Sequence, residues 1–150
     1  MLGYSKIVTI YTFSIFYVVV GIKHFTDLCF FVSIMPPYIP FHKFFIYTSG
    51  FFEILFGFLL LIKRTRKFAG IGLIYLLVFV FPANVHLYLS EVAQKALSIT
   101  QNDALIRLPF QLPLMIIAFW HAEENSTKFF DIFCSLIFFP TILYFLSLAL

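Results

Sequence analysis

A single carboxylate lies in the middle of an apolar run. In residues 44–62, FFIYTSGFFEILFGFLLLI, Glu53 is the only Asp, Glu, Lys, Arg or His. A charged residue at the centre of a membrane helix costs about 2.5–3.5 kcal/mol on insertion scales, whereas a hydrogen bond between membrane helices contributes about 0.6 kcal/mol. Ser or Thr would supply such a bond at lower cost. We therefore expect Glu53 to serve a polar pocket, with hydrogen bonding between helices as the alternative.

Other polar side chains lie near one end of the neighbouring apolar runs. Arg107 and Gln111 are four residues apart and would share a helix face, and Pro82 stands just before a polar pair in its own run. Buried polar groups are retained where they are paired, hydrated or neutralised. The candidate ligand-binding residues are Glu53, His24, Asn84, His86, Arg107 and Gln111.

The chemistry open to this set is limited. Two histidines and Glu53 could form a two-His-one-carboxylate metal site, but no run carries H-x-x-x-H, so we expect no metal. Arg107 is a counter-ion for Glu53 or for a ligand, or extends its charge to the membrane surface. No nucleophile–base pair or nucleotide motif is visible, so catalytic residues stay unassigned. We expect Tyr17 to serve packing, and His42 and His121 to be interfacial.

Composition requires a lipid environment for most of the chain. The 150 residues are 62% hydrophobic and 11% charged, with a mean hydropathy of +1.01, whereas soluble domains are about 25% charged. The net charge of +3 is concentrated in KRTRK (63–67), between two apolar runs, which is typical of a topology signal and not of nucleic-acid binding. Cys29 and Cys134 form no C-x-x-C, which argues against a zinc site or dithiol centre.

The apolar runs predict an all-α integral membrane four-helix bundle. About 20 apolar residues span a bilayer as a helix. Prolines 36, 37 and 40 interrupt the chain between the first two runs, where the aromatic first half of 26–43 could form a short interfacial helix. The expected spans are 6–25, 44–62, 68–89 and roughly 105–122.

A last apolar run, 129–150, forms a C-terminal hydrophobic extension. It is long enough for a fifth crossing, although Asp131 and Pro140 weaken it. We therefore divide the chain into a four-span domain, 1–125, and a C-terminal segment, 126–150, and leave the fifth span open. The polar stretch 90–103 is expected to connect the third and fourth spans.

The Lys/Arg distribution orients the bundle in the cell membrane. Placing KRTRK in the cytoplasm puts the N-terminus inside and both long connections outside. The six candidate residues then lie in the outer halves of the spans, and the inner halves offer little that is comparable. Asn125, in an N-S-T sequence, is cytoplasmic in this topology and is expected to be unmodified.

Several segments together resemble the DoxX-like family of small membrane proteins. They are GIKHF (21–25), MPPYIP (35–40), SGFFEILFG (49–57), KRTRKFAGIGLI (63–74), FPANVHLYL (81–89) and RLPFQ (107–111). The resemblance covers about residues 5–122 and implies a four-helix membrane bundle associated, in some members, with quinol oxidase and thiosulfate:quinone chemistry. It also implies that the polar positions of the family are those in the candidate set, with Gly21.

The leading interpretation is a quinone-linked oxidoreductase subunit or accessory with a polar pocket in the outer leaflet. No cofactor is certain from the sequence, and quinone is the candidate. A subunit without its own cofactor requires a membrane or peripheral redox protein partner, besides the lipid bilayer. The alternative is a non-catalytic membrane assembly or structural factor in which the polar cluster fixes helix register. A solute or proton carrier would need polar steps in the inner halves, which the sequence lacks.

Overall fold

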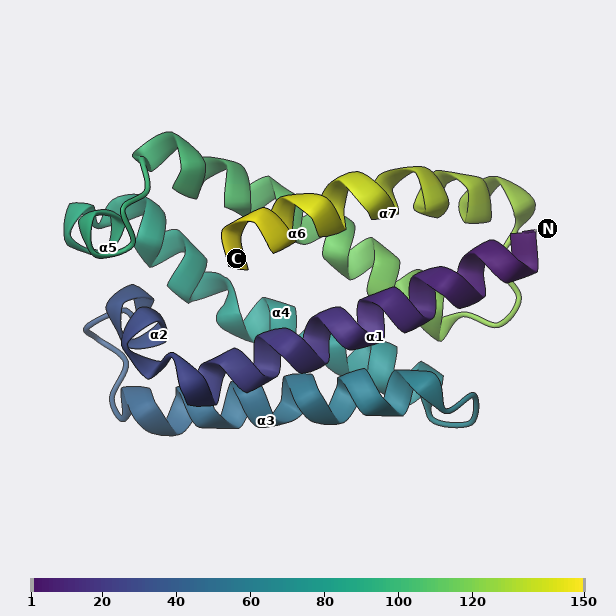
Figure 1. Cartoon of the computed structure of the whole chain (residues 1–150), viewed down its shortest axis with the longest axis horizontal. Coiled ribbons are helices and arrows are strands. Elements are labelled where there is room, and N and C mark those ends of the chain that lie inside the picture. The colour runs from purple at the N-terminus through teal and green to yellow at the C-terminus, as the bar shows by residue number, and fades with distance from the viewer. Residues whose placement is uncertain (1, 150) are drawn as a thin grey trace.

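The computed structural model describes residues 2–149, and within this range all regular structure is helical. Five long helices form the bundle, and two short ones lie together at one end of it (Figure 1). The bounds are α1 Leu2–Thr26, α2 Leu28–Ile34, α3 His42–Leu61, α4 Arg66–Leu89, α5 Glu91–Ala96, α6 Gln101–Ala122 and α7 Lys128–Ala149.

All five long helices are long and apolar enough to cross a membrane. The qualifying segments include Lys128–Ser147 in α7, so the C-terminal run has the length and composition of a fifth span. Large apolar side chains cover the outside of the bundle, as at Tyr75 and Phe79, each 72% exposed. An apolar surface of this extent is typical of a protein that contacts lipid. The chain is a multi-pass membrane helical bundle, which confirms the predicted fold class.

Local capping explains where several helices begin. The Asp27 side chain accepts from Phe30 N at the start of α2, and Ser90 does the same for Ala93 N in α5. At the start of α6, Thr100 and Asp103 form a reciprocal capping box. The polar stretch 90–103 connects α4 to α6, as expected, but it is not all loop, because Ser90 caps the short helix α5 and α6 begins at residue 101.

Glycines bring the long helices together as two tight pairs. In the α1–α3 pair, a Cβ added at Gly21 would lie 2.7 Å from the Gly50 carbonyl oxygen. Ser14 Oγ donates to the Gly57 carbonyl at 2.5 Å, so the same pair is also joined further along. In the α4–α6 pair, a Cβ added at Gly70 would lie 2.6 Å from the Ala118 carbonyl oxygen. Small residues permit such backbone approach in membrane helices.

The two pairs meet mainly through side chains. At the α3–α4 contact, the Phe56 ring packs over Gly72. A shared core is formed by residues of α1, α3, α4, α6 and α7, and it includes Phe13, Leu60, Leu73, Ile117 and Phe138. Because Phe138 belongs to this core, α7 is packed into the bundle and is not an appendage.

The two ends of the bundle differ. At the end that carries α2 and α5, called here the α2 end, the two short helices share a small core with α4 and α6 formed by Ile34, Leu87, Ala93 and Ala104. The opposite end, called here the KRTRK end, carries residues 62–65 and 123–127 and the start of α1 (Figure 1).

Candidate functional site

A cavity of about 540 Å³ lies between the two helix pairs, toward the α2 end. Ligand pockets in proteins are typically about 300–1,000 Å³ and largely apolar with a few polar groups. The wall of this cavity follows that pattern. Its polar members are Tyr17, His24, Ser49, Glu53, Asn84 and Arg107, and its apolar members include Phe16, Phe31, Phe45, Phe79 and Phe145.

Glu53 is buried beside His24. Its side chain is 11% exposed, and its Oε2 lies 3.2 Å from His24 Nδ1. Nδ1 also lies 2.9 Å from the Val20 carbonyl oxygen. A carbonyl only accepts, so Nδ1 carries a proton and donates it to Val20. The contact between Glu53 and His24 is therefore a close polar contact, and Oε2 itself remains without a hydrogen bond.

Gly50 makes this contact geometrically accessible. A Cβ added to Gly50 would lie 2.5 Å from the Cβ of His24, which is closer than two carbons can approach without displacement. Because glycine has no Cβ, α1 and α3 approach each other closely at the position of the His24 side chain. Glu53 lies three residues later, on the same face of α3. The glycine–glutamate spacing in the sequence thus predicts the packing that the structure has.

Three buried polar atoms around the cavity have no hydrogen-bond partner within the described part of the chain. They are Tyr17 Oη, Glu53 Oε2 and Arg107 Nε, each on a side chain that lines the cavity. An unsatisfied buried polar group costs about 1–3 kcal/mol, more when it is charged. Three such atoms around one cavity are the arrangement that a polar ligand headgroup would complete.

Arg107 is not the counter-ion of Glu53. Among the described residues, the close contacts between an acidic and a basic side chain are His24 with Glu53 and Lys95 with Glu91. Arg107 instead lines the cavity from α6. The sequence offered two counter-ion roles for Arg107, one with Glu53 and one with a ligand. The geometry excludes the pair with Glu53 and leaves Arg107 available to a ligand.

Asn84 and Gln111 are joined to each other. Asn84 Nδ2 donates to Gln111 Oε1 at 3.1 Å, and Gln111 Nε2 donates to the Leu77 carbonyl. Pro82 lacks an N–H for the carbonyl of Val78, next to Leu77, so the helical hydrogen bonding of α4 is interrupted here. Gln111 thus holds Asn84 at the cavity wall. It also donates a hydrogen bond to α4 backbone at Leu77, next to the carbonyl that Pro82 leaves without its helical partner.

The structure brings four of the six candidate residues to one cavity and places a fifth behind them. Glu53, His24, Asn84 and Arg107 line the wall, and Gln111 contacts it through Asn84. His86 is half-buried and does not line this cavity. His86 lies beyond Asn84 toward the end of α4, and Asn84 is the last α4 residue that lines the cavity.

Tyr17 is the polar residue that sequence reasoning assigned to packing. It is 3% exposed, and its ring packs edge-on against Phe13 and Phe16. Its hydroxyl nevertheless ends at the cavity without a partner. Tyr17 and His24 are seven residues apart, two helical turns, and this spacing was the available signal that both face the same side.

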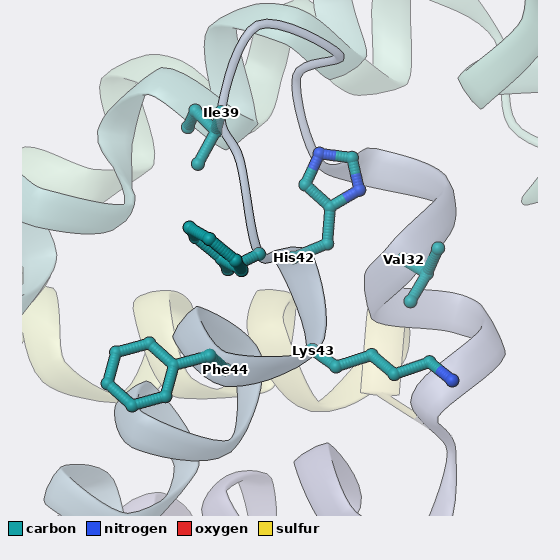
Figure 2. Close-up of a pocket in the computed structure, with 6 residues that line it drawn as sticks. Val32, Ile39, His42, Lys43 and Phe44 are labelled. Atoms are coloured by element: carbon teal, nitrogen blue, oxygen red, sulfur yellow. The ribbon is translucent and has the colours of Figure 1, made fainter.

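A second, shallower pocket of about 390 Å³ lies at the α2 end (Figure 2). It is lined by Val32, Ile39, Phe41, His42, Lys43 and Phe44. His42 Nε2 lies 3.0 Å from the Pro36 carbonyl, which ties the start of α3 to the proline-containing connection. None of the six candidate residues lines this pocket, which shares Ile39 with the cavity at Glu53.

The KRTRK end also carries a polar cluster, contrary to the expectation that this half offers little. Lys6 Nζ donates to the Glu123 carbonyl at 2.7 Å and to Ser126 Oγ at 3.0 Å. Asp131 Oδ1 accepts from Trp120 Nε1 at 2.7 Å and from Ser126 Oγ at 2.5 Å. Asp131 was expected to weaken the last helix, but these bonds fasten α7 to α6.

His121 belongs to the same end, where it is buried inside the bundle. It is 1% exposed, and its Nε2 lies 3.1 Å from Thr9 Oγ1. The rings of Phe13 and Trp120 pack against it, with centroids 5.1 and 5.0 Å away. This polar network is enclosed by aromatic side chains and fixes the α1–α6 contact.

Comparison with known proteins gives a family but no activity. No curated protein and no solved structure matches the chain. A family profile described as "Domain of unknown function (DUF8561)" matches residues 13–122. The match runs from the first helix to the end of α6 and covers well over half of the chain. The chain therefore belongs to the DUF8561 family.

Proposed function

We propose that the chain is a membrane subunit that binds a quinone in the cavity between its two helix pairs. The observation that carries the proposal is the set of buried atoms without partners, Tyr17 Oη, Glu53 Oε2 and Arg107 Nε, around a largely apolar cavity. An apolar wall with a few polar groups suits an amphiphile whose small headgroup accepts hydrogen bonds.

The donors and acceptors fit a quinone headgroup. A quinone presents two carbonyl oxygens, which only accept, and Tyr17 and Arg107 are both able to donate. The phenylalanine side chains of the wall suit its ring. Reduction of a quinone takes up protons, and Glu53 beside His24 is placed to hold one and to pass it on.

The electrons must come from elsewhere. The chain has no C-x-x-C, and its two cysteines lie on different helices, with Cys134 fully buried. We therefore propose a redox protein partner, in the membrane or bound to it. The proposal includes a relationship to the DoxX-like proteins, a location in the cell membrane and a cytoplasmic N-terminus, all supported by the sequence motifs and the Lys/Arg distribution.

A structural or assembly role is the second candidate, and one observation favours it. Glu53 and His24 meet across the tightest part of the α1–α3 contact, where Gly21 and Gly50 approach backbone to backbone. A polar pair at such a place could fix helix register without any ligand. The two functions make different predictions for a substitution of Glu53.

Binding of a decyl-tailed benzoquinone to the purified chain in lipid nanodiscs tests the proposal. A quinone carbonyl only accepts, so Glu53 contributes to binding by donating from a protonated carboxyl, and a Gln amide would still be able to donate. Glu53→Leu removes the donor, and we expect the affinity to fall about tenfold, as for loss of a hydrogen bond. The matched control is Glu91→Leu, because Glu91 is exposed in α5, where it pairs with Lys95. It should bind like the unmodified protein.

The same preparation separates the two functions. If neither the unmodified protein nor Glu53→Leu binds quinone, and the substitution only lowers the unfolding temperature, the ligand-binding function is wrong and the structural one is favoured. If binding falls while the unfolding temperature is kept, the carboxylate acts on the ligand.

A further inference from the structure

The cavity has one place where its wall reaches the outside of the bundle. Among the residues that line it, Val78 is 55% exposed and Phe79 is 72% exposed, and every other lining residue is buried or half-buried. Both lie on α4. The mouth of the cavity is therefore on the flank of the bundle, at α4.

The position of this mouth along the membrane-spanning helix determines whether lipid or water lies outside it. Val78 and Phe79 stand at the middle of α4, Arg66–Leu89, which is long and apolar enough to cross the membrane. The middle of a spanning helix is surrounded by lipid hydrocarbon and not by water. A molecule that passes this mouth enters from the bilayer.

The α2 end of the cavity is covered. Phe30, Phe31, Ile34 and Met35 line it from the α2 side, and the Phe31 ring stacks on the His24 imidazole with centroids 3.7 Å apart. In Figure 1, α2 lies between the diverging ends of α3 and α4, and it contacts both helices. Apolar side chains thus separate the polar groups from the aqueous side at this end.

The other side of the mouth is formed by α3. Phe45 lines the cavity, and its ring centroid lies 6.4 Å from that of Phe79. The α3–α4 contact is made mainly of side chains, whereas the α1–α3 and α4–α6 contacts bring glycine against backbone. Side chains can change rotamer, so of these three contacts the α3–α4 gap is the one that can open by side-chain rotation without separating the helix backbones.

From these features we infer that the ligand is a lipid-soluble amphiphile that enters from the bilayer through the gap between α3 and α4, and that its apolar tail lies between Phe45 and Phe79 and extends into the lipid. The cavity of about 540 Å³ accommodates a headgroup and the first part of a tail, and a longer tail must leave by the mouth. The inference rests on the proposed ligand-binding function and adds the route and the position of the tail.

Photo-crosslinking of the full chain in nanodiscs tests the position of the tail. The probe is a decyl-tailed benzoquinone with a diazirine in the tail, and peptide mass spectrometry locates the adduct. We expect adducts within residues 44–49 and 78–82, and competition by unlabelled decyl-benzoquinone. Competed adducts on α6 or α7 would overturn the inference, because the tail would then leave on the other side.

A substitution at the mouth tests the route. Val78→Trp places a large side chain at the opening, and we expect the association rate of the decyl-tailed quinone to fall about tenfold, as for a binding step that now requires a side chain to move. The matched control is Val8→Trp, since Val8 is 57% exposed on α1 and does not line the cavity. Equal association rates for the two variants would overturn the proposed route.

A tail-free benzoquinone separates this inference from the proposed function. If the tail-free and decyl-tailed quinones bind equally well, normalised to their concentrations in the bilayer, the cavity binds quinone but the tail position is wrong. If neither binds, the proposed function itself is wrong. The expected result, after this normalisation, is several-fold tighter binding of the tailed quinone, because the first part of its tail packs in close contact with the rings of Phe45 and Phe79.

Discussion

Gly50 lies against His24 so closely that a Cβ added to the glycine would be 2.5 Å from the Cβ of the histidine. One turn further along α3, Glu53 Oε2 lies 3.2 Å from His24 Nδ1. The first contact sets the second, because the separation of α1 and α3 at Gly50 determines whether the carboxylate reaches the imidazole.

Gly50→Ala is expected to destabilise the bundle. The added methyl group must displace α1 or His24, and overpacking of this kind costs about 1–3 kcal/mol. The measurement is the thermal unfolding of the purified chain in detergent. Gly3→Ala is the control, since an added Cβ there meets no atom within 4 Å. Equal unfolding temperatures for the two variants would show that the α1–α3 contact is looser than described.

Gln111→Leu tests the polar link between α4 and α6. The substitution removes the hydrogen bonds to the Asn84 amide and to the Leu77 carbonyl, and a buried group left without a partner costs about 1–3 kcal/mol. Gln101→Leu on the exposed start of α6 is the matched control and should unfold at the original temperature. If Gln111→Leu is as stable as its control, the link does not stabilise the bundle.

Asp131→Ala is expected to loosen α7 at the KRTRK end. Trp120 donates to Asp131 and is the only tryptophan of the chain, so its fluorescence reports this contact directly. We expect a changed emission maximum and easier proteolysis between α6 and α7. Asp131→Asn keeps an acceptor oxygen and should retain most of the original spectrum. Asp27→Ala, in the cap of α2, should leave the emission unchanged, and an unchanged spectrum in Asp131→Ala would contradict the role of the bond.

Cysteine labelling in intact cells tests the orientation. Cys29 is exposed in α2, whereas Cys134 is buried. A membrane-impermeant maleimide is expected to label the chain from outside, and Cys29→Ser should abolish the label. A reporter fused after residue 125 should read cytoplasmic. Labelling only after permeabilisation, with an external reporter signal, would reverse the proposed topology and expose Asn125 to glycosylation.

Much of the bundle could be predicted because the signals are local. Apolar runs of sufficient length give the spans, and the spacing of Gly50 and Glu53 in one run gives the face that meets α1. The helix α5 was missed although Ser90 is a good cap residue, because a polar composition was taken to indicate a connection.

The remaining features depend on contacts between distant segments. Lys6 lies far in the sequence from Trp120 and Asp131. Only the packing of α1, α6 and α7 brings the three side chains together at the KRTRK end. The same holds for Tyr17, since its phenol is typical of either packing or binding. Its role at the cavity depends on where α3, α4 and α6 leave a space.

The glycine contacts have a mechanical consequence. Backbone approach at Gly50 brings α1 against α3, and at Gly70 it brings α4 against α6, so we expect each pair to be stiffer than the contact between the pairs. The cavity lies at that softer contact. If a ligand enlarges the cavity, we expect one helix pair to shift relative to the other, with little change inside either pair.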